Sequence, residues 1–240
     1  MDNSFAFVAD IHLRADQPRK GEIFIAFLDS LRETTRHLFI LGDLFDFWAG
    51  PKHASLREHV PVADKLRELS SAGMQIKFLF GNRDFHAEPY LAAHGVACAG
   101  NSLHLCLGQK QVLLTHGDLL CTNDTSYRVM AKIFRSPVVK WLYSSLPLSV
   151  SYPIAAGLRD LSRRTAPRKP EMIRGLSFTT ISEHFERGVD VIICGHVHKA
   201  GRYARQFGEK TKEVYVLGDW DVTPNYLLFT NQSWQFRRFP

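Results

Sequence analysis

The chain contains short, nearly continuous apolar runs in which β-branched and aromatic side chains are frequent. A strand that is apolar at almost every position, instead of at every second one, is buried on both faces of its sheet. We therefore expect buried strands at seven places: Phe5–Ala9, Leu38–Leu41, Ile76–Phe80, Val112–Thr115, Val191–Cys194, Val214–Leu217 and Tyr226–Phe229.

Stretches with the 3.6-residue period of an amphipathic helix lie between several of these runs, at Gly21–Thr34, Leu56–Ser71 and Pro170–Arg187. This alternation predicts a layered α/β domain around a largely parallel or mixed sheet. Because 240 residues suffice for one domain with a large core, we expect residues 1–240 to form a single domain.

Residues 124–174 break the strand–helix alternation. This stretch has helical character but is interrupted by Pro137, Pro147, Pro153 and Pro167. Its first half is apolar and aromatic, and its second half is rich in arginine. We expect a helical cap inserted into the domain, not a separate domain. Apolar residues here can simply pack helix on helix, and a basic helix face is often only solvated.

The charge balance points to an anionic partner. Lysine and arginine number 30 against 24 acidic residues, a formal net charge of +6, which suits a nucleic acid, a nucleotide or a phospholipid surface. No apolar run approaches the roughly 20 residues that cross a bilayer. The N-terminus lacks the features of a secretory signal, so we expect a cytoplasmic protein.

Polar side chains that can bind metal ions follow five of the expected strands. Each one alone is commonly a helix cap or a turn residue. Candidates that follow five strands point to one shared site, because ligands of α/β sheets gather beyond the carboxyl ends of the strands. The candidate ligands are Asp10, His12, Asp43, Asn82, His116, His196 and His198.

Two carboxylates, four imidazoles and one amide are too many donors for one tetrahedral zinc ion. They suit two adjacent divalent cations that share a carboxylate, and we expect Asp43 to be that bridge. A mixed nitrogen and oxygen set without thiolate favours Mn, Fe, Zn or Co over Mg or Ca. Two such cations would activate a water for attack on phosphorus and neutralise the phosphoryl oxygens.

The motifs Asp-x-His, Gly-Asp, Gly-Asn-x-Asp, His-Gly-Asp and Gly-His-x-His resemble the signature of calcineurin-like metallophosphoesterases. Longer stretches, Leu41–Trp48, Gly81–Phe85 and His116–Asp124, resemble the UDP-2,3-diacylglucosamine diphosphatase (hydrolase) family of lipid A biosynthesis. The resemblance implies a β-sandwich of two mixed sheets flanked by helices, with a helical cap. It also implies hydrolysis of the UDP-2,3-diacylglucosamine pyrophosphate to UMP and 2,3-diacylglucosamine 1-phosphate.

The same resemblance implies two divalent metal ions, with Mn²⁺ the expected metal, and a monomer bound peripherally to the cytoplasmic side of the inner membrane. The metal ligands it implies are the seven candidates above. The catalytic residues it implies are Asp43, Asn82, Arg83 and His116. The substrate-binding residues it implies are Asn82, Arg83, Asp124, Tyr127, Arg159, Ser162 and His196.

Arg83 supports this narrower family on physical grounds. Most calcineurin-like enzymes resemble Gly-Asn-His-Asp/Glu at this point, and that histidine can protonate an alkoxide leaving group. Arginine does not give up its proton, since its pKa exceeds about 12, but it binds phosphate well. Arg83 therefore suits a phosphate leaving group, as in a pyrophosphate. The structural alternative is a simple ion pair with Asp84 or Asp118.

Two other functions are compatible with the sequence. The first is a metallophosphoesterase that acts on another nucleotide pyrophosphate or on a phosphodiester. The second is a basic nucleic-acid-binding protein or nuclease. Because the positive residues stand beside apolar cap residues and not among stacking aromatics, we expect no nucleic-acid partner. A non-catalytic scaffold ranks last, since such proteins tend to lose ligands.

Overall fold

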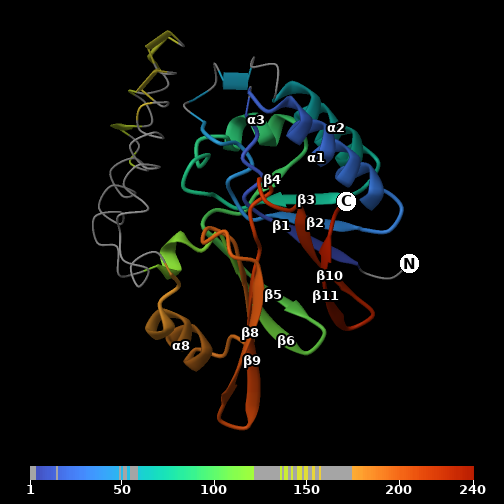
Figure 1. The fold of residues 1–240 in the computed structure, drawn as a ribbon, viewed down its shortest axis with the longest axis vertical. Coiled ribbons are helices and arrows are strands. Elements are labelled where there is room, and N and C mark those ends of the chain that lie inside the picture. Colours follow the sequence, from blue (N-terminus) through green and yellow to red (C-terminus); the bar gives the residue numbers. More distant parts are fainter. Residues whose placement is uncertain are drawn as a thin grey trace.

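Two β-sheets pack face to face in this computed structural model, and helices cover their outer faces (Figure 1). The structure describes residues 4–14, 16–48, 50, 53–54, 59–121 and 175–240, with isolated residues between 136 and 157. The predicted sandwich of two mixed sheets flanked by helices is confirmed. Among the helices described, none is both long enough and apolar enough to cross a membrane.

The first sheet has six strands in the order β11-β10-β1-β2-β3-β4. Strands β1 to β4 run parallel, β10 is antiparallel to β1, and β11 is antiparallel to β10. Their bounds are β1 Phe5–Val8, β2 His37–Ile40, β3 Gln75–Phe78, β4 Ala97–Cys98, β10 Asn225–Thr230 and β11 Ser233–Arg238.

The second sheet has five strands in the order β5-β6-β7-β9-β8. Its three inner strands are parallel, and each edge strand is antiparallel to its neighbour. Their bounds are β5 Ser102–Leu107, β6 Lys110–Thr115, β7 Val191–Cys194, β8 Gly201–Phe207 and β9 Lys210–Val216.

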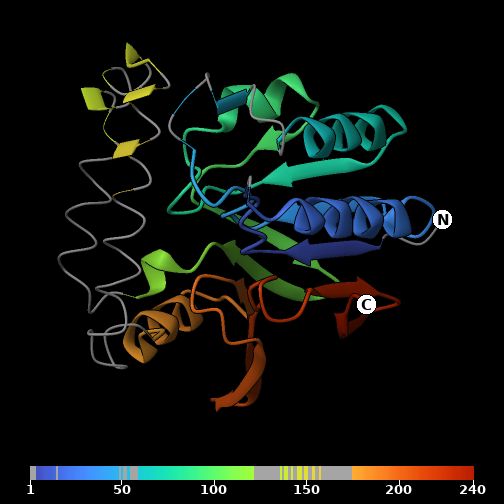
Figure 2. The same ribbon diagram turned by 45° about the horizontal axis from the view of Figure 1, so that its top comes forward.

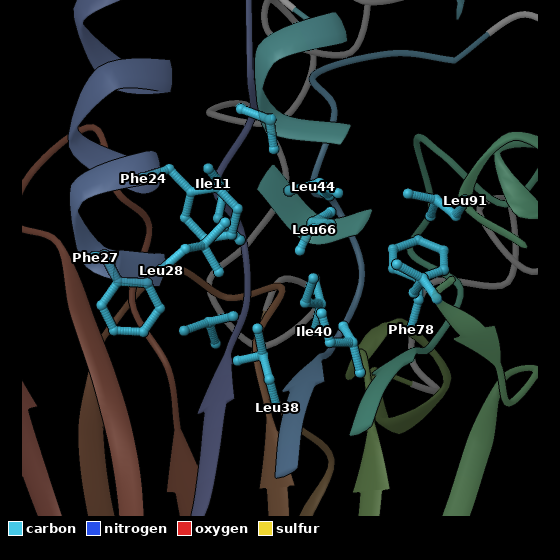
Figure 3. Packing of buried hydrophobic residues seen from close by; sticks show 14 of the residues in the cluster. Ile11, Phe24, Phe27, Leu28, Leu38, Ile40, Leu44, Leu66, Phe78 and Leu91 are labelled. Carbon is cyan, nitrogen blue, oxygen red and sulfur yellow. The ribbon is translucent and has the colours of Figure 1, made fainter. Parts of the chain in front are cut away.

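Strands β1, β2 and β10 of the first sheet are apolar at successive positions because both of their faces are covered. On β1, Ala6 and Val8 face the helices, whereas Phe7 belongs to the apolar layer between the sheets. Helices α1 (Pro18–Leu31) and α2 (Val60–Ser71) lie side by side over the outer face (Figure 2). Figure 3 shows Phe24, Phe27 and Leu28 of α1 pointing into the apolar layer between these helices and the first sheet.

Helix α8 (Phe178–Glu186) covers the outer face of the second sheet with Ile181 and Phe185. It begins later than the expected helix Pro170–Arg187. The prediction was wrong for residues 175–177, which are not helical. The reason is a cap: Ser177 is extended, and its Oγ accepts a hydrogen bond from Thr180 N (3.4 Å), which starts the helix there.

Six elements were not expected from the sequence: α3 (Glu88–Ala93), the 3-10 helix η2 (Asp118–Leu120), β4, β5, β8 and β11. The helices are short, and the strands lie at or next to the edges of their sheets, where exposed positions break an apolar run. The predicted cap, 124–174, lies mostly outside the described residues. Its described residues at Val138, Leu142 and Val150 are helical and exposed.

Candidate metal centre

Strands of both sheets end at one rim of the sandwich, and the loops after them hold the predicted ligands. Backbone hydrogen bonds join these loops: Asp10 N donates to Gly42 O (3.2 Å), and Gly195 N donates to His116 O (2.8 Å). The structure brings together all seven candidates at this rim: Asp10, His12, Asp43, Asn82, His116, His196 and His198.

Three of the candidates form a group that we call the His198 group: Asp10, His12 and His198. Asp10 Oδ1 lies 3.5 Å from His198 Nε2 and 3.8 Å from His12 Nε2. The two imidazole Nε2 atoms are 3.3 Å apart. These donor atoms surround one point, as the ligands of a single cation do.

Three others form the Asn82 group: Asn82, His116 and His196. Asn82 Oδ1 lies 2.9 Å from His116 Nε2 and 3.0 Å from His196 Nδ1. Asp43 stands between the two groups, since its Oδ2 is 3.7 Å from His116 Nε2 and 3.9 Å from His12 Nδ1. This is the position that the predicted bridging carboxylate needs.

The donor set fits a divalent metal ion. Asp10 Oδ1, the carboxylate oxygen that faces both imidazoles of the His198 group, is buried and has no hydrogen-bond partner among the described residues. A buried polar atom without a partner is destabilising unless a ligand satisfies it. His116 Nδ1 donates to Leu41 O (2.8 Å), which fixes the tautomer and leaves the Nε2 lone pair free to bind a metal.

The backbone at the rim is strained where the candidates lie. A left-handed φ is unusual outside glycine and costs on the order of 1 kcal/mol or more for each residue. Aspartate and histidine tolerate it better than most residue types, and such strain gathers at functional sites. Five candidates have φ between 52° and 70°: Asp10, His12, Asp43, His196 and His198.

Two glycines make room for the carboxylates. A Cβ on Gly81 would collide with Asp43 Oδ1, and a Cβ on Gly195 would collide with Asp10 Oδ2.

Asp84, which is fully buried, accepts hydrogen bonds from the backbone N of Asp43 (3.2 Å) and Gly81 (3.3 Å) and so holds two loops together. Burial and the neighbouring Asp43 raise the pKa of Asp84 to about 7.

Burial shapes the electrostatics of the imidazoles. It lowers the pKa of His12 well below the usual range and the pKa of His196 to about 4. Both are therefore neutral at pH 7, which is the form that binds a metal ion. For His198 burial acts in the same direction, but the carboxylates of Asp10 and Asp219 outweigh it and raise the pKa to about 10.

Arg83 reaches the centre from the loop after β3. Its Nη1 lies 2.8 Å from Asp46 Oδ1, and its Nε lies 3.4 Å from Asp43 Oδ2. The alternative partner Asp84 instead accepts backbone hydrogen bonds, one of them from Phe45 N (3.2 Å). The Arg83 side chain stays 21% exposed, so it faces both the centre and solvent.

Asp219 contacts the centre and had no role assigned from the sequence. Its Oδ2 lies 3.0 Å from His198 Nδ1. A signal existed, because the run Val214–Leu217 is followed by Gly218-Asp219 just as other strands are followed by ligands. The remaining predicted substrate contacts lie outside the described residues and stay predictions: Asp124, Tyr127, Arg159 and Ser162.

Residues 4–200 match the family model described as calcineurin-like phosphoesterase. The chain belongs to this family. Its membership and the ligand set at the rim identify a metal-dependent hydrolase, as expected from the motifs.

Curated relatives extend over nearly the whole chain. A UDP-2,3-diacylglucosamine hydrolase from Pseudomonas fluorescens is 32% identical, over 97% of this chain and 93% of the relative. One with the same name from Pasteurella multocida is 34% identical, over 96% and 95%. Among solved structures, the E. coli phosphoesterase Yfce is 18% identical with a TM-score of 0.47, over 99% of this chain and 100% of that chain.

Proposed function

We propose that this protein hydrolyses the pyrophosphate of UDP-2,3-diacylglucosamine to UMP and 2,3-diacylglucosamine 1-phosphate, with two divalent cations, expected to be Mn²⁺. The observation that carries the chemistry is the pair of donor groups on either side of Asp43. The names of relatives that match nearly the whole chain support the substrate.

The His198 group would hold one cation and the Asn82 group the other, with Asp43 shared. When bound, the cations supply Lewis-acid polarisation of the phosphoryl oxygens and activation of the attacking water. The protein keeps the ligands in place beforehand, since the His116 ring is fixed through Leu41 O (2.8 Å). Such preorganisation avoids rearrangement during the reaction.

Arg83 is the proposed phosphate-binding residue beside the cations. Its guanidinium Nε lies 3.4 Å from Asp43 Oδ2, and this closeness to the proposed shared carboxylate supports a role in binding the pyrophosphate. It stabilises negative charge there but does not serve as a proton donor. The departing phosphate of a pyrophosphate needs no general acid, which makes this residue compatible with the proposed reaction.

Exposed apolar residues of the predicted cap are the proposed contact for the lipid part of the substrate. Val138, Leu142, Val150 and Ile154 are all helical and between 42% and 72% exposed. Exposed apolar residues on helices suit acyl chains or a membrane surface. We infer a monomer attached peripherally to the cytoplasmic face of the inner membrane, where such a lipid would be found.

The decisive experiment compares substrates in Mn²⁺-supplemented buffer. UDP-2,3-diacylglucosamine is expected to be converted to UMP and the phosphorylated lipid at a far higher kcat/KM than UDP-sugars without acyl chains. Equal turnover of both would favour the alternative, a hydrolase of nucleotide pyrophosphates in general. Isotopically labelled water shows which phosphorus is attacked, since the label ends in either UMP or the lipid phosphate.

A further inference from the structure

His198 is packed less closely than His12 and His116. Its side chain is 36% exposed, whereas those of His12 and His116 are 4% and 0% exposed. Its backbone is left-handed, with φ of 59°. Packing alone therefore does not fix the ring, and a partner for its second nitrogen decides how it is oriented.

Asp219 is that partner. Its Oδ2 lies 3.0 Å from His198 Nδ1, while His198 Nε2 faces Asp10 Oδ1 at 3.5 Å. The other carboxylate oxygen, Oδ1, accepts a hydrogen bond from Val222 N (3.2 Å), which fixes the rotamer of Asp219. The carboxylate thus accepts the Nδ1 proton, so Nε2 is the nitrogen on which a cation of the His198 group would replace the proton.

The loop that holds Asp219 is anchored on both sheets, because it joins β9 of the second sheet to β10 of the first. Asn225 clamps its start: Gly218 N donates to Asn225 Oδ1 (3.0 Å), and Asn225 Nδ2 donates to Gly218 O (3.2 Å). Trp220 N donates to Asp10 O (3.1 Å). The loop therefore has a fixed position relative to one of the ligands it serves.

We propose that Asp219 is a positioning residue for the cation of the His198 group, acting through the His198 ring and not by touching substrate. This rests on the proposed function, since it assumes a centre with two cations. The effect is confined to one cation, because His116 of the Asn82 group has its own fixing partner in Leu41 O. Loss of such a partner typically weakens metal binding about 10- to 100-fold.

The variants separate positioning from local folding. Asp219→Ser keeps a short hydroxyl that can accept from Val222 N, as serine does in such turns, but cannot reach His198. Asp219→Ala removes both contacts. Asp190→Ser is the matched control, because Asp190 Oδ2 also accepts a backbone hydrogen bond, from Gln111 N (3.0 Å), at the opposite end of β7.

The test is a Mn²⁺ titration of the full, chelator-stripped chain, with bound ions counted and followed by electron paramagnetic resonance. Wild type and Asp190→Ser are expected to bind two coupled ions. Both Asp219 variants are expected to bind one ion with unchanged affinity and the second about 10- to 100-fold more weakly. In a His198→Ala background, Asp219→Ser is expected to cause no further loss.

Three results would overturn this role while leaving the metal centre intact: two tight ions in Asp219→Ser, equal weakening of both ions, or an undiminished effect of Asp219→Ser in the His198→Ala background. The last two would indicate a general structural role. A wild-type chain that binds fewer than two ions would instead contradict the centre itself, and the role of Asp219 with it.

Discussion

The buried imidazole of His59 makes the stability of this protein depend on pH in a calculable way. Its ring packs against both Phe45 (4.5 Å between ring centroids) and Trp48 (5.3 Å), and its side chain is almost fully buried. Its Nδ1 donates to His53 O (2.9 Å). Burial lowers the pKa of His59 from the usual 6.5 to about 4, although the carbonyl partner opposes this.

The lowered pKa of His59 in the folded state determines the direction in which the free energy of unfolding changes with pH. Above pH 6.5 His59 is neutral in both states and contributes nothing. As the pH falls from 6.5 to 4, the unfolded chain binds the proton first, so the free energy of unfolding decreases. Each unit of pKa difference is worth about 1.4 kcal/mol, which gives about 3 kcal/mol lost by pH 4 and about 2 kcal/mol by pH 5.

His59→Phe keeps an aromatic ring but neither titrates nor donates to His53 O. We expect this variant to be about 1 kcal/mol less stable than wild type at pH 7, because a buried carbonyl loses its donor. At pH 5 the order is reversed and the variant is about 1 kcal/mol more stable. Urea denaturation at fixed pH, with chelator in excess so that metal binding does not vary, measures both values.

Two results would refute this reasoning. If the stability curves of wild type and His59→Phe ran parallel from pH 7 to 5, His59 would not be the titrating group. If the His59 ring protons titrated near pH 6.5 in the folded protein by NMR, its burial would not exclude the proton.

Other variants test the site. Asp43→Ala is expected to lower kcat by at least about a thousandfold with an unchanged circular dichroism spectrum; retained activity would contradict the shared carboxylate. Arg83→Ala should lower kcat/KM by about a hundredfold and keep its bound ions, so ion loss in metal analysis would contradict a role in phosphate binding. In Gly195→Ala the new Cβ would collide with Asp10 Oδ2 and Ala9 Cβ. We expect weaker Mn²⁺ binding in titrations and a loss of about 1–3 kcal/mol in the free energy of unfolding by urea. Unchanged Mn²⁺ binding would disprove the close approach.

The central strands were predictable because burial on both faces removes the alternation of polar and apolar residues. Val191–Cys194 was expected with its observed bounds, since every residue of β7 is buried. The edge strand β8 has exposed residues at most positions, so its sequence carries no apolar run. Its formation depends on pairing with β9, a contact that local sequence does not reveal.

The ligands were predictable for a related reason: parallel strands end on the same side, so residues after them meet. The side-chain contacts of individual site residues were not predictable. Arg83 contacts Asp46, which lies in a different loop, and that distance depends on how two loops pack. Asp219 could have been found by the strand-end rule, but Gly-Asp alone is a common turn sequence. The left-handed backbone at Asp10 and His12 also has no clear local signal.

Seven side chains at one rim of the sandwich are proposed to hold two cations. Anomalous scattering from crystals grown with Mn²⁺ tests it most directly. We expect two peaks, one within the His198 group and one within the Asn82 group, with Asp43 in contact with both. A single peak, or strong peaks only elsewhere on the molecule, would contradict it.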